Sequence, residues 1–302
     1  MSGAMLLGPS RPMSGWKRSS DVNRLRNSMA KLAVAVTVSA TATMQTEAES
    51  PQRVVSMNLC TDQLAMMLAG DGQLVSVSAI ARDPLSSAMH EEARDYPING
   101  GAAEEIYLLQ PDLVLAGVWS DPATVSMLRR LGIEVAQLDV ADSLEQIPDR
   151  VAEMGALLGR EAEAQALIHR FETDLADLAE PPGGPRAAFY YPNGYTLGTG
   201  SLSHDILTHA GFTHIVEELG RDASGRVALE ILVRAAPDLV IGTETYPGAS
   251  RSEEILEHPA LRTLVSAAHG TTSGPGWVCG TPHVVEALAD LAEDRAEIEA
   301  AR

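Results

Sequence analysis

The chain has 302 residues, enough for two lobes of ordinary domain size, each with its own hydrophobic core. It carries a formal net charge of -19 at pH 7, and so acidic a surface repels phosphate backbones, which excludes nucleic acids as expected partners. Only 4% of the residues are aromatic although 45% are hydrophobic, so aromatic residues that gather in one region are informative.

The chain begins with a segment that is typical of a secretion signal. An apolar stretch over residues 32–42 follows several basic residues, ends in Ala40 and Ala42, and is too short to span a membrane comfortably. We therefore expect residues 1–48 to comprise a signal peptide, with Met29 as the natural start and an over-called segment before it. No cysteine directly follows the apolar stretch, so we expect a periplasmic, soluble protein without a lipid anchor.

An internal repeat is the strongest architectural signal. The segments that begin at Glu104 and Glu230 both place this glutamate seven residues before a Pro-Asp-Leu-Val run, and the two copies lie 126 residues apart. The proline fixes the end of a short helix, and the apolar run has the length of a strand buried on both faces of a parallel sheet. Each copy therefore predicts half of a βαβ unit.

Further apolar runs of strand length begin at Arg53, Gln73, Glu134 and Arg186. Helical patterns over 61–69 and 123–131 separate those of the first half. The sequence therefore predicts an α/β protein with two Rossmann-like lobes and mostly parallel sheets, over residues 51–141 and 181–302.

The connector between the lobes, residues 142–180, is predicted to be helical. Its part from Arg160 to Leu178 is rich in Ala, Leu, Glu and Arg, enough for a helix of about 28 Å at 1.5 Å per residue, and the Pro-rich segment 181–185 stops it. We expect one long helix over about residues 150–179, which makes a stiff hinge.

Together these features resemble the periplasmic binding proteins of ABC importers for ferric siderophores, haem and vitamin B12, the rigid class with a single linking helix. The resemblance covers about residues 51–300 and rests on the run from Arg53 to Gln63, the doubled motif, residues 131–135, the connector and Gly276-Trp-Val. It implies a monomeric protein that is not an enzyme and has no cofactor. Such a protein captures a metal chelate, cobalamin or a ferric siderophore, and delivers it to an ABC permease dimer with its ATPase.

In this family, one glutamate on each lobe docks into arginine pockets of the two permease subunits. The resemblance places Glu104 and Glu230 in this role, with Glu105 as a neighbour that shares it, and their matched positions suit a two-fold permease. A carboxylate in the first turn of a helix also interacts favourably with the helix dipole without any docking role, and this alternative stays open.

Ligands of parallel-sheet lobes bind at the carboxyl ends of the strands, and the loops predicted there hold two of the three Trp and four of the six Tyr. Flat aromatic faces bind corrins, porphyrins and aryl siderophores by stacking, and an arginine pairs with an anionic chelate. Packing at loop edges is the alternative for each aromatic. The candidate ligand-binding residues are Asn58, Cys60, Arg82, Trp119, Tyr191, Tyr195, Tyr246 and Trp277.

The two cysteines, Cys60 and Cys279, fall in these cleft loops, one in each lobe. Two free buried thiols, a disulfide that closes the cleft, and direct metal coordination are the three hypotheses, of which we prefer the first. The eight His show no metal-ligand spacing, so we expect no metal site.

Enzymatic functions are disfavoured. The turn after the first strand is Asn-Leu-Cys-Thr-Asp instead of Gly-x-Gly-x-x-Gly, and no Gly-x-Ser-x-Gly elbow occurs. The alternatives that stay open are a haem-binding or free-metal-ion-binding protein of a related importer and a non-transport sensory module on the same fold.

Overall fold

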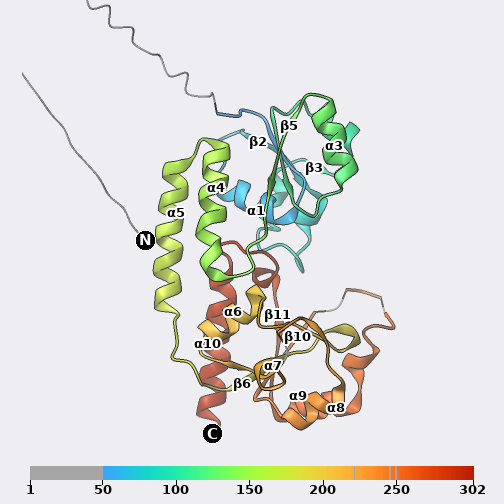
Figure 1. Cartoon of the computed structure of the whole chain (residues 1–302), viewed down its shortest axis with the longest axis vertical. Helices are drawn as coiled ribbons and strands as arrows, with labels where there is room; N and C mark the ends of the chain where they lie inside the picture. Colours follow the sequence, from blue (N-terminus) through green and yellow to red (C-terminus); the bar gives the residue numbers. More distant parts are fainter. Residues whose placement is uncertain (1–49, 221, 245, 249) are drawn as a thin grey trace, which may run out of the picture. The chain divides into compact units, whose positions relative to one another are not determined.

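A computed structural model describes residues 50–220, 222–244, 246–248 and 250–302 (Figure 1). The described residues belong to one compact unit. The predicted signal peptide, residues 1–48, lies outside the described residues. Among the helices of the described part, none is long and apolar enough to cross a membrane.

The first lobe contains a five-stranded parallel sheet in the order β3-β2-β1-β4-β5. Its strands are β1 (Val54–Ser56), β2 (Leu74–Ser78), β3 (Ile98–Asn99), β4 (Leu113–Gly117) and β5 (Glu134–Leu138). Its helices are α1 (Leu59–Leu68), α2 (Ala103–Leu108) and α3 (Pro122–Arg130). All five residues of β4 are buried, as the continuous apolar run predicted for a strand covered on both faces.

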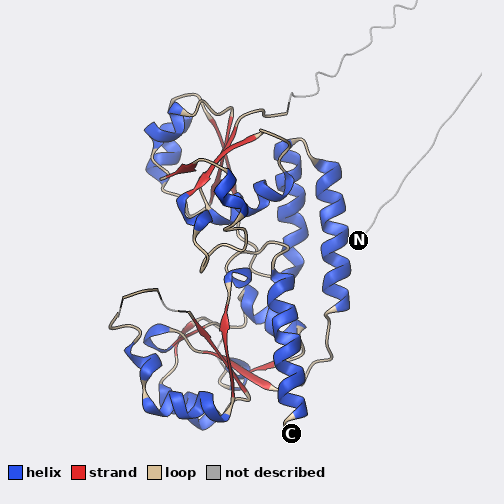
Figure 2. Ribbon diagram, turned by 180° about the vertical axis from the view of Figure 1, so that it is seen from behind, coloured by secondary structure: helices blue, strands red, loops and turns tan. Residues whose placement is uncertain are grey.

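The second lobe contains a four-stranded parallel sheet in the order β11-β10-β6-β8, together with a small antiparallel pair, β7 and β9. Its strands are β6 (Arg186–Phe189), β7 (Tyr195–Thr196), β8 (Thr213–His214), β9 (Gly225–Arg226), β10 (Leu239–Thr243) and β11 (His269–Ser273). Its helices are α6 (Leu202–His209), α7 (Ile215–Glu218), α8 (Leu229–Ala235), α9 (Pro259–Ala267) and α10 (Val284–Ala300). The predicted class, an α/β protein with two lobes of parallel sheet, is confirmed (Figure 2).

The repeat is visible in the topology. The strands that carry the two Pro-Asp-Leu-Val copies, β4 and β10, occupy the same place in their sheets, because β5-β4-β1-β2 has the same pattern as β11-β10-β6-β8. The two lobes are therefore related βα arrangements, as the matched spacing of the motif predicted.

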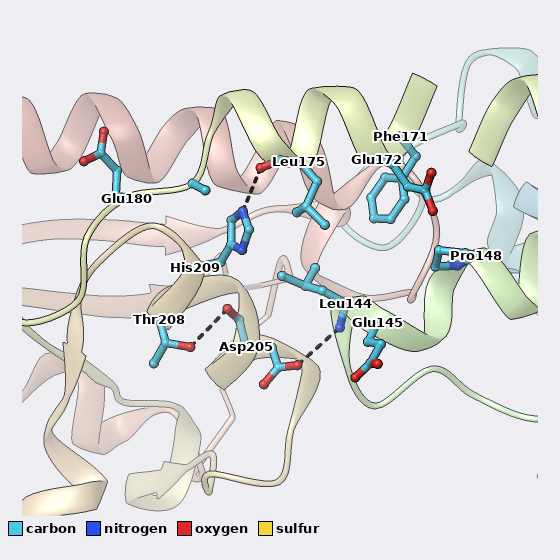
Figure 3. Close-up of a pocket in the computed structure, with 11 residues that line it drawn as sticks. Leu144, Glu145, Pro148, Phe171, Glu172, Leu175, Glu180, Asp205, Thr208 and His209 are labelled. Atoms are coloured by element: carbon cyan, nitrogen blue, oxygen red, sulfur yellow. Dashed lines mark hydrogen bonds between the residues drawn. The ribbon is translucent and has the colours of Figure 1, made fainter. Parts of the chain in front are cut away.

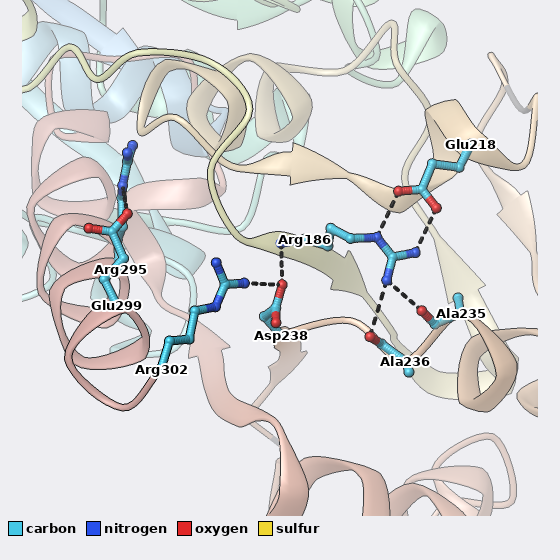
Figure 4. Close-up of polar contacts among 8 residues, drawn as sticks. All are labelled: Arg186, Glu218, Ala235, Ala236, Asp238, Arg295, Glu299 and Arg302. Atoms are coloured by element: carbon cyan, nitrogen blue, oxygen red, sulfur yellow. Dashed lines mark hydrogen bonds and ion pairs between the residues drawn. The ribbon is translucent and has the colours of Figure 1, made fainter.

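The aspartate of each motif copy caps the first strand of its lobe. Asp112 accepts a hydrogen bond from the backbone N–H of Arg53 at 3.0 Å, and Asp238 accepts one from that of Arg186 at 2.7 Å (Figure 4). The two arginine side chains in turn donate hydrogen bonds to backbone carbonyls at the end of the helix that precedes each Pro-Asp-Leu-Val copy. These carbonyls belong to Leu109 and Gln110 in the first lobe and to Ala235 and Ala236 in the second. The motif thus joins a helix end to a strand start, which explains its Pro-Asp pair.

The residue before each proline adopts a left-handed backbone conformation, with φ of 51° at Gln110 and 43° at Ala236. A following proline disfavours the right-handed helical conformation, so the helix stops there, and the turn that results costs some backbone strain for a residue with a Cβ. Both copies share this turn, and in both the glutamate lies in the first turn of the preceding helix of six or seven residues.

The connector differs from its prediction, because it contains two helices instead of one over residues 150–179. Helix α4 (Ile147–Leu158) ends at Gly159, which has φ of 66°, and helix α5 (Glu161–Asp177) runs back beside it (Figures 1 and 2). A Cβ at Gly155 would overlap that of Ala164, so this glycine permits the close approach of the two helices. Only α5 serves as the long helix that leads from the first lobe to the second.

One hydrophobic cluster continues through both lobes. It includes Leu64 and Leu68 of α1, Met154 of α4, Phe171 of α5 and Leu288 of α10, all nearly or fully buried. Separate clusters fill the space between the first sheet and α2 and α3, and between the second sheet and α8 and α9. The continuous cluster resists separation of the lobes, since opening them there would expose apolar surface.

Candidate functional site

A cavity of about 290 Å³ lies between the two lobes. Its first wall comes from the segments that follow β1, β4 and β5, where ligands of parallel sheets bind. Its second wall comes from the start of α6 and from the segment before α10. Of the predicted ligand-binding residues, the cavity brings together Asn58, Cys60, Trp119 and Trp277.

Asn58 is held in place by helix α1. Its side chain caps the helix by accepting a hydrogen bond from the backbone N–H of Cys60 at 3.1 Å. Gly117, at the end of β4, leaves room for it, because a Cβ there would lie 3.1 Å from the Asn58 amide. The amide is therefore fixed at the wall of the cavity before any ligand arrives.

The two tryptophans of the cavity have different surroundings. Trp277 is 9% exposed and packs with its ring at 78° to that of Phe189, with centroids 5.6 Å apart. Trp119 is 84% exposed. Trp277 is thus part of the rigid wall, whereas Trp119 offers an open aromatic face for stacking.

The three predicted tyrosines do not line this cavity. Tyr191 donates a hydrogen bond to Ser273 at 3.3 Å, and burial raises its pKa to about 12. Tyr195 lies in β7, is 42% exposed and pairs with the neighbouring strand β9. Tyr246 joins the lobes, because its hydroxyl donates to Asp83 at 2.7 Å and lies 2.9 Å from the hydroxyl of Ser86.

Arg82 lies outside the cavity as well. Its guanidinium donates to three backbone carbonyls of its own lobe, those of Ala93, Arg94 and Tyr96. These bonds hold the short helical turn at 79–82 against the one at 92–95. The arginine that lines the cavity is Arg150 of α4, which pairs with Glu153 at 2.5 Å and whose buried Nε has no hydrogen-bond partner among the described residues.

Sequence reasoning does not find Arg150, because nothing in its local sequence distinguishes it from other helix-surface arginines of the connector. Asp139 and Asp142 also line the cavity. They follow β5, so the rule that places ligands at strand carboxyl ends was sufficient to find them.

Cys60 and Cys279 form a disulfide, with Cα atoms 5.4 Å apart. The preferred hypothesis of two free thiols is therefore wrong, and direct metal coordination by these residues is wrong with it. The start of α1 and the segment after Trp277 meet at the cavity. The two cysteines are 219 residues apart in the chain, and the sequence alone does not show that they lie close together.

A buried carboxylate lies behind the cavity wall. Asp62 of α1 is fully buried and accepts hydrogen bonds from the hydroxyl and the backbone N–H of Ser78 in β2. Burial raises its pKa from 3.8 to about 6, although these hydrogen bonds oppose the shift. Next to it, Thr61 lines the cavity and bonds to Ser56 at 2.8 Å, so this polar network anchors α1 to the sheet.

A larger cavity of about 650 Å³ lies among α5, α6 and the start of α4 (Figure 3). Four carboxylates line it, those of Glu145, Glu172, Glu180 and Asp205. His209 donates to the carbonyl of Leu175 there, and Phe171 is its one aromatic residue. Its acidic lining does not suit the stacking of a flat chelate, whereas Trp119 and Trp277 line the smaller cavity.

The predicted docking glutamates occupy equivalent positions. Glu104 lies in the first turn of α2 and Glu230 in the first turn of α8, and both are exposed. The neighbouring Glu105 accepts a hydrogen bond from the backbone N–H of Gly100 at 2.7 Å, so its carboxylate caps its own helix. In the described part of the chain, no group of three or more His, Cys, Asp or Glu is placed to hold a metal ion.

Comparison with known proteins gives one family. A family model described as periplasmic binding protein matches residues 54–271. A cobalamin-binding protein of Halobacterium salinarum is 27% identical over 259 residues, which are 82% of this chain and 68% of that protein. An uncharacterized ABC transporter substrate-binding lipoprotein of Bacillus subtilis is 24% identical over 264 residues, 80% of this chain and 81% of that one.

Among solved structures, a periplasmic haem-binding protein of a Roseiflexus species in its apo form has the same fold. Its TM-score is 0.67 at 20% identity, with 82% of this chain and 98% of that chain covered. At this identity the similarity concerns the fold alone.

Proposed function

This chain belongs to the periplasmic binding protein family, and we propose that it captures a metal chelate, cobalamin or a ferric siderophore, between its lobes and hands it to an ABC permease. The family is one of solute-binding transport proteins. The observation that carries the proposal is the cavity lined by both lobes, with one tryptophan in its wall and another exposed beside it. The similarity to a cobalamin-binding protein favours cobalamin as the first ligand to test.

The size of the cavity constrains how a large chelate binds. At about 290 Å³ it is at the small end of ligand pockets. A corrin-sized ligand inserts one part of itself there and lies with the rest against the exposed face of Trp119. Arg150, Asp139 and Asp142 at the same site supply both signs of charge, which suits a chelate with polar groups around its rim.

Delivery follows from the pair of glutamates. We assign Glu104 and Glu230 to contact with the two permease subunits, and the matched helix starts support this role. An ATPase then drives import. Residues 1–48 are removed as a signal peptide, and the acidic mature protein then acts as a periplasmic monomer.

The binding test uses three probes, cyanocobalamin, haemin and ferrioxamine B. The purified protein is mixed with each at micromolar concentration, passed through a desalting column and scanned for co-eluting visible absorbance, while tryptophan fluorescence reports affinity. Cyanocobalamin or ferrioxamine B should co-elute, and Trp119→Ala should weaken binding by about 1 kcal/mol or more without changing stability. Retention of haemin alone would replace the proposed ligand by haem, and retention of none of the three would refute the proposed function.

A further inference from the structure

The disulfide belongs to the cavity itself. Cys60 lies in the first turn of α1 and lines the cavity, and its cap residue Asn58 lines the same wall. Cys279, which is 1% exposed, follows the opposite wall residue Trp277 by two positions. The bond therefore joins the two walls directly, one from each lobe.

A side-chain hydrogen bond between the lobes lies beside the disulfide. Thr281 donates a hydrogen bond to Gln63 at 3.1 Å, and both residues are fully buried. The other amide atom of Gln63, Nε2, is buried without a hydrogen-bond partner among the described residues. Gly280 packs against Ala141 so closely that a Cβ would not fit. One neutral hydrogen bond next to an unsatisfied donor stabilises this contact only weakly.

Other links between the lobes are found at further positions. Helix α5 connects them through the chain, and Tyr246 joins them through hydrogen bonds to Asp83 and Ser86. The continuous hydrophobic cluster, which includes Trp277, also resists separation of the lobes, but hydrophobic contact is non-directional. A disulfide fixes the distance between its two Cα atoms, here 5.4 Å, so the covalent bond sets the spacing of the two cavity walls.

We propose that the Cys60–Cys279 disulfide is the positioning element of the ligand cavity, which holds the Asn58 wall and the Trp277 wall at the spacing that the chelate needs. The proposal rests on the proposed function. A site that is already formed in the free protein binds without the cost of ordering its walls, so its affinity is higher than that of a site assembled on binding. The disulfide thus acts on affinity as well as on stability.

The test compares the native protein with Cys60→Ala/Cys279→Ala, in which alanine avoids a buried hydroxyl without a partner. The control is Thr281→Val, which removes the adjacent hydrogen bond and destabilises the same contact but keeps the disulfide. Affinity for cyanocobalamin, or for whichever of haemin and ferrioxamine B the native protein binds, is measured by tryptophan quenching where circular dichroism shows all proteins folded. Solution scattering gives the radius of gyration with and without the probe. If the double variant does not fold, native protein reduced with TCEP after folding takes its place.

We expect the double variant to bind at least about tenfold more weakly, with a larger radius in the free form that contracts when the probe binds. Thr281→Val should unfold more easily yet keep native affinity and radius. Unchanged affinity or an unchanged free-state radius in the double variant would overturn the proposal, because the bond would then be only a stabilising cross-link. If the native protein binds none of the three probes, the proposed function fails, and the radius of the free double variant still decides whether the disulfide sets the spacing.

Discussion

Replacing the carboxylate of Asp62 by the amide of asparagine changes the charge of a fully buried group and almost nothing of its shape. The folded protein holds the proton of this carboxyl more tightly than the unfolded chain, because burial raises the pKa from 3.8 to about 6. Between these two values the unfolded chain loses its proton first, so the stability of the native protein falls as the pH rises through this window. The loss is complete above about pH 6.

The size of the loss follows from the shift. About 2 pKa units at 1.36 kcal/mol per unit correspond to about 3 kcal/mol. In Asp62→Asn the remaining oxygen still accepts from the Ser78 backbone N–H, and the new amide N–H donates to the Ser78 hydroxyl, which rotates to accept it. We therefore expect the variant to be about 1 to 3 kcal/mol more stable than the native protein at pH 7 and of equal stability near pH 3.5.

Urea unfolding of both proteins from pH 3.5 to pH 8 measures this difference, since the contributions of all other groups cancel in it. Asp121→Asn is the control, because Asp121 is an exposed helix cap whose pKa is lowered by hydrogen bonds from Thr124 and Ala123, so its replacement should lower stability at pH 7. A difference between Asp62→Asn and the native protein that does not grow from pH 4 to pH 6 would refute the reasoning. A variant that is less stable than the native protein at pH 7 would refute it equally.

Three further predictions concern docking, the cavity wall and acid sensitivity. The double variant Glu104→Ala/Glu230→Ala should keep chelate affinity but impair uptake into vesicles that carry the cognate permease. The control Glu161→Ala on α5 should change neither affinity nor uptake. Normal uptake by the double variant would limit both glutamates to a role at their helix starts. Trp277→Ala should lower both affinity and the free energy of unfolding, the latter by about 3 kcal/mol or more because the ring is buried, and denaturant unfolding that matched the native protein would contradict this packing. Burial and the nearby His204 lower the pKa of His214 from 6.5 to about 3. Below pH 6.5 the unfolded chain therefore binds a proton at this residue before the folded protein does, so the stability of the protein should fall as the pH falls from 6.5 toward 3. A His214→Gln protein with the same acid sensitivity as the native one would exclude this cause.

The sequence was sufficient for the parts of the fold that depend on local pattern. The strand at Glu134–Leu138 was found with its observed bounds, and the helices predicted at 61–69 and 123–131 lie within two residues of α1 and α3. The repeat predicted two related lobes because both copies of Pro-Asp-Leu-Val follow a short helix and open a buried strand. Asn58 and Trp119 reach one cavity because the parallel strands of the first sheet bring their carboxyl ends together, and Trp277 follows a strand of the second sheet in the same way.

Tertiary contacts decided the rest. A glycine inside a helical pattern does not reveal whether it is tolerated or ends the helix, and at Gly159 the packing of α4 on α1 and α5 made it a reversal. Each of Arg82 and Arg150 has an aspartate as its neighbour in the sequence. In the structure, however, the guanidinium of Arg82 donates to backbone carbonyls of its own lobe, whereas Arg150 lines the cavity. Cys60 and Cys279 pair because two lobes fold against each other, and a contact across 219 residues depends on the relative placement of whole elements, which local propensity and spacing do not determine.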